Sequence, residues 1–124
     1  MCTILLPIKP EYVNKIINQS KLYEYRRRVS KKKIKKIVIY STAPVKKIVA
    51  EVEVKSIISN TPNKLWSETR QYSGISKADY MKYFKNKRTA YAYELGDVII
   101  YEHPKSLTDI GINYHPQSYV YLND

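Results

Sequence analysis

Apolar residues recur along this chain with two spacings, one of about two residues and one of three to four, which predict short strands and short helices. Strands are expected where apolar and polar residues alternate or form a short apolar run: 3–8, 21–28, 37–40, 45–59, 89–95, 98–101 and 119–122. Helices are expected where apolar residues repeat at helical spacing after a proline or a capping residue: 10–18, 61–73 and 76–84. Gly96 and Asp97 separate two of the strands and are typical of a β-hairpin turn.

The number and order of these elements indicate the fold class. Two or three short helices scattered among the strands do not give the regular βαβ alternation of a doubly wound sheet. They predict an α+β domain built on a small, strongly bent mixed sheet or barrel of about six strands. The chain has 124 residues without an internal repeat or low-complexity linker, so one domain covering residues 1–124 is expected.

The net charge and the aromatic composition indicate a possible binding function. The formal net charge is +11, and thirteen of the fifteen aromatic residues are tyrosine. Cations interleaved with tyrosine rings suit RNA or single-stranded nucleic acid, because the cations attract phosphates and the rings stack on bases. No stretch is apolar enough to span or coat a membrane, so a membrane partner is not expected. The simpler alternatives are a charge that only maintains solubility and tyrosines that only fill a sheet.

Cysteine and histidine narrow the chemistry further. Cys2 is the only cysteine, which excludes an internal disulfide, and the two histidines, His103 and His115, have no ligand partner at short spacing. No metal and no cofactor are therefore expected. The first residues lack the apolar core of a signal peptide, so we expect a cytoplasmic protein.

The most informative stretch runs from Lys21 to Lys36. It begins with strict alternation, which places Glu24 and Arg26 on one face of the predicted strand. Eight of the eleven residues from 26 to 36 are cationic, so this part must face water or a polyanion. Lys21 and Glu24 fall on opposite faces of an ideal strand, which argues against contact unless a bulge intervenes.

The same residues resemble the signature of the ASCH family, a branch of the PUA-like superfamily of small β-barrels. That signature is glycine, any residue, lysine, two residues, glutamate, one residue and arginine, and here Lys21, Glu24 and Arg26 match it. Gln19 stands where glycine is usual, so the turn is expected to use another left-handed residue, with Asn18 as the candidate. Other segments resemble one ASCH subgroup, namely IKPEYVNKI, YEYRRR, VIYSTAPV, the Leu-Trp helix, YSGISKADY, AYAYEL and PQSYVYL.

The resemblance implies a fold and several functions. It implies a PUA-like mixed β-barrel and a module that binds RNA or a modified nucleotide in a cleft beside the signature strand. Some ASCH members are hydrolases, and these include ribonucleases and an amidohydrolase that deacetylates a modified cytidine. In that amidohydrolase a threonine follows the signature lysine by three residues, whereas this chain has Glu24, which puts deacetylation by that route in doubt.

Three hypotheses for function follow. The first is nucleic-acid binding, with a site that comprises Lys21, Tyr23, Glu24, Arg26, Arg27, Arg28, Lys31, Lys32, Lys33, Tyr40, Ser41, Thr42, Gln117 and Ser118. The second is a small hydrolase of RNA or of a modified nucleoside, with Lys21 as base or nucleophile and Glu24 as its partner, although a purely structural charge network would also explain both residues. The third is a transcription-associated regulator that binds proteins through the aromatic helical face of Trp66, Tyr72, Tyr80, Tyr83 and Phe84, a face that would more often be core.

Overall fold

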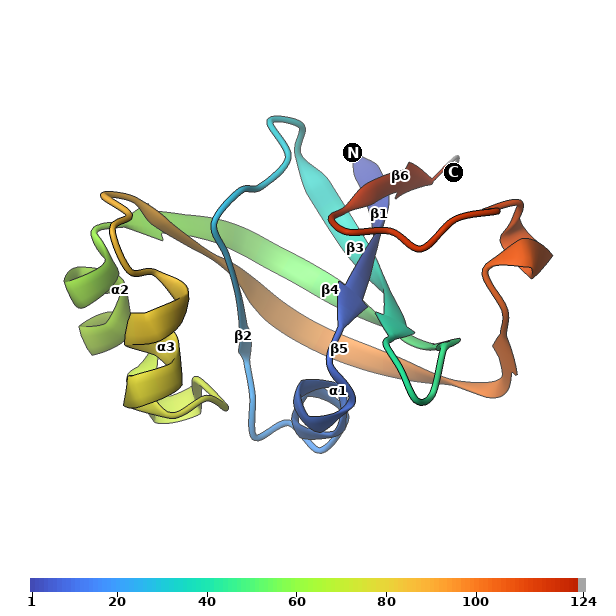
Figure 1. Ribbon diagram of the computed structural model, residues 1–124, viewed down its shortest axis with the longest axis horizontal. Coiled ribbons are helices and arrows are strands. Elements are labelled where there is room, and N and C mark those ends of the chain that lie inside the picture. Colours follow the sequence, from blue (N-terminus) through green and yellow to red (C-terminus); the bar gives the residue numbers. More distant parts are fainter. Residues whose placement is uncertain (123–124) are drawn as a thin grey trace.

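The computed structural model describes residues 1–122, in which a twisted sheet carries helices at one end and beside its first strand (Figure 1). The strands are β1 (Cys2–Ile8), β2 (Tyr23–Arg26), β3 (Ile34–Ser41), β4 (Lys47–Asn60), β5 (Ala90–Lys105) and β6 (Val120–Leu122). The α-helices are α1 (Pro10–Ile17), α2 (Pro62–Thr69) and α3 (Lys77–Tyr83), and two 3-10 turns cover Arg70–Tyr72 and Thr108–Ile110. None of the helices in this described part is long and apolar enough to cross a membrane.

The sheet is mixed and open. Its strand order is β2-β5-β4-β3-β1-β6, with β1 parallel to β3 and every other neighbouring pair antiparallel. The predicted α+β class, the six strands and the three short helices are confirmed. A closed barrel is not formed, because within residues 1–122 the edge strands β2 and β6 pair with β5 and β1 and not with each other.

The predicted hairpin at Gly96 is wrong, because β5 runs straight through this position. Val52 pairs with Val98 and Val54 with Leu95, so β5 holds one residue more than β4 over this interval. Gly96 and Asp97 therefore form a β-bulge, where glycine is common because the neighbouring strand approaches closely. A Cβ atom at Gly96 would collide with the side chain of Glu53.

The helices begin at the residues that the sequence predicts. The hydroxyl groups of Thr61 and Ser76 accept hydrogen bonds from backbone N–H groups in the first turns of α2 and α3. The aromatic face of these helices is mainly core: Tyr80 and Phe84 are buried, and only Tyr72 is well exposed, at 45%. The regulator hypothesis therefore lacks most of the surface that it requires.

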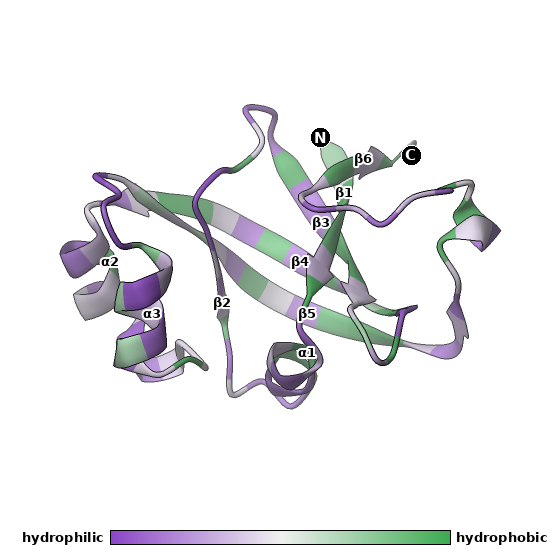
Figure 2. Cartoon of the chain, in the orientation of Figure 1, coloured by the Kyte–Doolittle hydropathy of each residue, from purple (hydrophilic) through white to green (hydrophobic). Residues whose placement is uncertain are grey.

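Alternation along the long strands positions the core. Green and purple or white segments alternate along β4 in Figure 2, and its buried positions Ile48, Ala50, Val52 and Val54 follow the same period of two. Val13 and Ile16 of α1 pack on the main apolar cluster. This packing holds α1 against β3 and β5, and the turn that follows α1 leads into β2.

Candidate functional site

A cleft of about 760 Å³ opens beside β2, between α1, α3, the turn after β3 and the segment 115–117. Among the described residues, six of its lining side chains are cationic and three are carboxylates. The cations are Lys9, Lys21, Arg26, Arg27, Lys46 and Lys82, the carboxylates are Glu11, Glu24 and Asp79, and the tyrosine rings are Tyr12, Tyr25, Tyr40 and Tyr83. The cleft therefore combines a positive balance with aromatic surface.

The turn between α1 and β2 places Lys21 at the bottom of this cleft. Asn18 has φ −84°, whereas Gln19 has φ 65°, so the expectation of a left-handed Asn18 is wrong and Gln19 itself takes that conformation. The backbone N–H groups of Ser20 and Lys21 both donate to the carbonyl of Lys15 at 3.0 Å. Because β2 begins only at Tyr23, Lys21 lies before the strand, and strand alternation does not separate it from Glu24.

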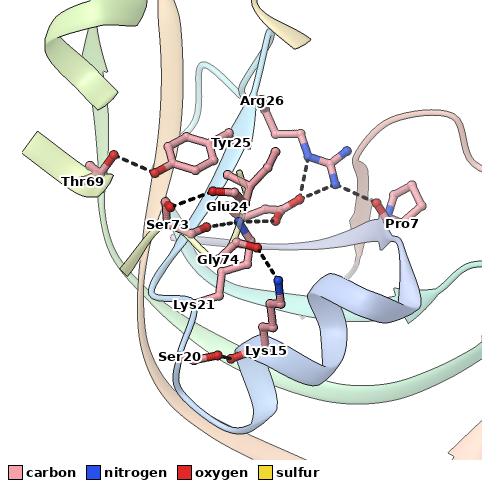
Figure 3. Close-up of polar contacts among 11 residues, drawn as sticks. Pro7, Lys15, Ser20, Lys21, Glu24, Tyr25, Arg26, Thr69, Ser73 and Gly74 are labelled. Atoms are coloured by element: carbon pink, nitrogen blue, oxygen red, sulfur yellow. Dashed lines mark hydrogen bonds and ion pairs between the residues drawn. The ribbon is translucent and has the colours of Figure 1, made fainter. Parts of the chain in front are cut away.

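Lys21 is a buried lysine whose amine is held by polar and aromatic groups (Figure 3). Its side chain is 2% exposed, and its Nζ donates to the carbonyl oxygen of Ser73 at 2.6 Å. The same Nζ lies 5.1 Å and 4.9 Å from the ring centroids of Tyr12 and Tyr25. The stem of Lys21 packs so closely on Gly74 that a Cβ atom there would be 2.5 Å from the Cβ of Lys21.

Burial changes the acidity of this amine. Loss of water around the charged form lowers the pKa of Lys21 to about 8, and the positive charges of Lys15 and Arg26 act in the same direction. The carboxylate of Glu24 opposes this shift and is the smaller influence. At pH 7 about one tenth of Lys21 is therefore the free amine, which can accept a proton, and this fraction grows as the pH approaches 8.

Glu24 lies between Lys21 and Arg26, and most of its charge is balanced by Arg26 (Figure 3). Arg26 donates to Oε2 of Glu24 from Nε at 3.1 Å and from Nη2 at 2.7 Å, and its Nη2 also donates to the carbonyl of Pro7 at 2.7 Å. Alternation in β2 explains why Glu24 and Arg26 share a face. The other oxygen, Oε1, is 3.9 Å from Nζ of Lys21, which is too long for a direct hydrogen bond.

The walls of the cleft are built from β2 and α3. The Tyr25 hydroxyl is hydrogen-bonded to the hydroxyl of Thr69 at 2.6 Å, and burial raises the pKa of Tyr25 so that it stays neutral. Arg27 donates from Nε to the carbonyl of Tyr83 at 2.8 Å, and its guanidinium lies 4.3 Å from the centroid of the Tyr83 ring. Arg27 is nevertheless exposed, so it presents a positive charge at the rim.

The structure brings half of the predicted site residues together and separates the others. The residues that line the cleft are Lys21, Glu24, Arg26, Arg27, Tyr40, Thr42 and Gln117. The residues that do not line it are Tyr23, Arg28, Lys31, Lys32, Lys33, Ser41 and Ser118. Tyr23 packs against the cluster around Leu65, Ser41 is buried at 2%, and the three lysines lie on the exposed loop before β3.

Several lining residues were not predicted. Lys9, Glu11 and Tyr12 come from the start of α1, Lys46 from the turn after β3, Asp79 and Lys82 from α3, and His115 from the loop before β6. No local sequence signal marks them, because each reaches the cleft only through the packing of its own element. Within residues 1–122 no group of three or more His, Cys, Asp or Glu side chains is placed to hold a metal ion.

Comparison with known proteins identifies the family and the fold of this chain. The family described as Domain of unknown function (DUF365) matches residues 1–114. The ATP synthase subunit alpha of Ureaplasma parvum serovar 3 is 29% identical over 121 residues, which cover 97% of this chain and 15% of that protein. The ASCH domain-containing ribonuclease of Zymomonas mobilis subsp. mobilis is 30% identical over 94 residues, which cover 75% of this chain and 64% of that protein.

The crystal structure of ASCH from Zymomonas mobilis superimposes on this chain with a TM-score of 0.90 and 28% identity, and covers 98% of this chain and 87% of that one. The resemblance to the ASCH family is therefore confirmed. The chain spans less than two thirds of the length of either relative compared by sequence.

Proposed function

This chain belongs to the DUF365 family and has the ASCH fold, and from that premise we propose that it binds single-stranded RNA in the cleft beside β2. The observation that carries the proposal is the lining of the cleft, in which cations outnumber carboxylates by six to three and tyrosine rings lie among them. The relative named as an ASCH domain-containing ribonuclease supports RNA as the ligand.

In this proposal, different residues of the cleft bind the phosphates and the bases of the RNA strand. Lys9, Arg27, Lys46 and Lys82 are exposed at the cleft and are available to phosphates. The half-buried rings of Tyr12 and Tyr83 offer stacking surface to bases. Four neutralised phosphates on a single strand correspond to a slope of roughly −3 in log affinity against log salt.

A titration of fluorescently labelled single-stranded RNA tests the binding proposal. The double variant Arg27→Ala, Lys82→Ala should weaken binding and flatten the salt slope by roughly one unit. A matched control is Lys55→Ala, Lys64→Ala, since both lysines are exposed and neither lines the cleft. The proposal fails if wild type binds no RNA at low salt, or if both double variants weaken binding equally.

The buried amine favours a second candidate function, cleavage of the bound RNA. A hydroxyl group placed between Nζ of Lys21 and Oε1 of Glu24 would bridge the 3.9 Å that separates these atoms. The neutral amine would take the proton of a ribose 2′-hydroxyl, and the 2′-oxygen would attack the adjacent phosphorus. The bond from phosphorus to the 5′-oxygen would break and that oxygen would take up a proton, which leaves a 2′,3′-cyclic phosphate and a 5′-hydroxyl.

The cleavage proposal is tested separately, by the pH dependence of the rate and by a Lys21 variant. With Lys21 as the base, the rate should rise about tenfold per pH unit below pH 8 and become constant above it, following the pKa of about 8. Lys21→Met should abolish cleavage and leave RNA binding nearly intact. A substrate with a 2′-deoxyribose at the scissile position is the chemical control. Equal turnover by wild type and the Lys21 variant, or turnover of the deoxy substrate, would exclude this mechanism.

A further inference from the structure

Four of the six basic residues predicted for the cleft between positions 26 and 33 lie outside it, on the loop between β2 and β3. Arg28, Lys31, Lys32 and Lys33 are all exposed. Across residues 1–122 none of these four side chains forms an ion pair with a carboxylate, whereas Lys36 further along is paired with Glu51 at 3.1 Å. The loop therefore carries four positive charges that the described part of the protein does not neutralise.

This loop is tied to the body of the protein. The buried Ser30 is hydrogen-bonded through its hydroxyl to the hydroxyl of Tyr121 in β6, and the same oxygen accepts from the backbone N–H of Lys32 at 2.9 Å. The backbone N–H of Cys2 donates to the carbonyl of Lys33 at 2.8 Å. The loop and β6 meet beside the start of β1 (Figure 1). The backbone of the loop is therefore held in place, so binding costs little further backbone entropy, although the exposed side chains still lose rotamer freedom.

Two tyrosines lie beside these cations. Nζ of Lys32 is 4.7 Å from the ring centroid of Tyr121, and the rings of Tyr119 and Tyr121 meet edge to face at 5.5 Å. Tyr121 is 42% exposed. Burial raises the pKa of the Tyr119 phenol, and the nearby charge of Arg28 opposes that rise, which places Arg28 at the same surface. We call Arg28, Lys31, Lys32, Lys33, Tyr119 and Tyr121 the basic platform.

The basic platform continues the cleft along two segments of the chain. Arg27 lines the cleft, and Arg28 of the platform is the next residue in the chain. On the other side Gln117 lines the cleft, and Tyr119 and Tyr121 follow on the same segment. The two segments join through the bond between Ser30 and Tyr121. A strand that leaves the cleft between them would meet both cations and an exposed tyrosine ring, the two kinds of group that bind phosphates and bases.

From this geometry we infer that the basic platform is a second contact surface for the same single-stranded RNA, which binds nucleotides that flank those in the cleft. The inference rests on the proposed function of the cleft. Arg28 and the three lysines neutralise phosphates, and the exposed part of Tyr121 stacks on one base. RNA is favoured over an anionic membrane because the platform places its cations beside tyrosine rings, which can stack on bases.

The experiment compares a short RNA of about four nucleotides, which fits the cleft, with a long RNA of about twelve, which reaches the platform. Wild type should bind the long RNA more tightly. The triple variant Lys31→Ala, Lys32→Ala, Lys33→Ala should lose about tenfold or more for the long RNA, with a salt slope flatter by roughly 2, and should bind the short RNA as wild type does. The matched control, Lys55→Ala, Lys64→Ala, Lys105→Ala, removes the same charge from other exposed positions.

Tyr121 provides an independent test of stacking. Tyr121→Leu should weaken binding of the long RNA about fivefold or more, and Tyr121→Phe, which keeps the ring but loses the bond to Ser30, should weaken it less. Equal affinity of wild type and the lysine triple variant for the long RNA overturns the inference, as does equal weakening by the two triple variants. Binding of phosphatidylserine vesicles that is lost in the lysine triple variant, with RNA binding unchanged, also overturns it. Failure of wild type to bind even the short RNA instead refutes the function proposed for the cleft.

Discussion

Replacing Lys21 by methionine should change how the stability of the folded protein depends on pH. Lys21 is 2% exposed, and burial lowers its pKa from 10.5 to about 8. Between these two values the unfolded chain keeps a proton that the folded protein has lost. The free energy of unfolding of wild type therefore rises with pH across this window, and the methionine variant lacks this rise.

The magnitude follows from the size of the pKa shift. At pH 7 the protonated amine is buried at a cost of about 3 kcal/mol, from about 1.4 kcal/mol for each pH unit between the two pKa values. At pH 9.5 the folded protein carries the neutral amine and more than half of this cost has gone. Between pH 7 and pH 9.5 wild type should thus gain about 2 kcal/mol of stability relative to Lys21→Met.

Urea unfolding at the two pH values measures this difference, and the single tryptophan, Trp66, reports unfolding by fluorescence. The variant lacks the hydrogen bond from Lys21 to Ser73 at both pH values, so the loss of this bond cancels when its stability at the two pH values is compared. Tyrosines with raised pKa titrate alike in both proteins and also cancel. The control is Lys31→Met, an exposed lysine for which wild type and variant should change equally with pH.

One result would refute the lowered pKa of Lys21. If wild type and Lys21→Met gain or lose the same stability between pH 7 and pH 9.5, the amine of Lys21 is not desolvated in the folded protein. The proposed role of Lys21 as a base near neutral pH would then lose its physical foundation, although RNA binding by the exposed cations would stand.

Three further substitutions test the construction of the cleft. Gln19→Gly should raise the melting temperature by a few degrees, because Gln19 has φ 65° and glycine tolerates this conformation at less cost; an unchanged or lower value would contradict the strain. Gly74→Ala should destabilise the protein by about 2 kcal/mol in urea unfolding, since φ is +66° and the new Cβ would be 2.5 Å from the Cβ of Lys21; a change below about 0.5 kcal/mol would count against that contact. Tyr25→Phe should cost about 1 kcal/mol, the worth of its hydrogen bond to Thr69, and an equal effect in a Thr69→Ala background would show that this bond contributes nothing.

Much of the local structure follows from the sequence. Alternation predicts the strands and places Glu24 and Arg26 on one face of β2, where they bond to each other. Capping residues and prolines predict where α2 and α3 begin. These features are local, because they depend on side chains a few residues apart that share one strand or one helical turn.

The conformation at Gly96 could not be predicted from the neighbouring residues alone. A glycine followed by aspartate between two alternating runs is a good hairpin signal, yet β5 continues through it because β4 offers a partner along its whole length. The extra residue of β5 forms a β-bulge, and glycine is required there because the side chain of Glu53 lies against it. Whether such a pair turns or bulges is decided by the length of the neighbouring strand, which lies far away in sequence.

Hydropathy, charge and local motifs were sufficient to predict an α+β chain with short elements, a strong positive charge, and a lysine, a glutamate and an arginine at the start of a basic run. The burial of Lys21 against Ser73 and Gly74, more than fifty residues away, and the division of the basic run between a cleft and a separate loop became evident only from the folded chain. Hydropathy patterns encode which side of an element faces the core. The acidity of a buried amine, in contrast, depends on which distant segments close over it and exclude water.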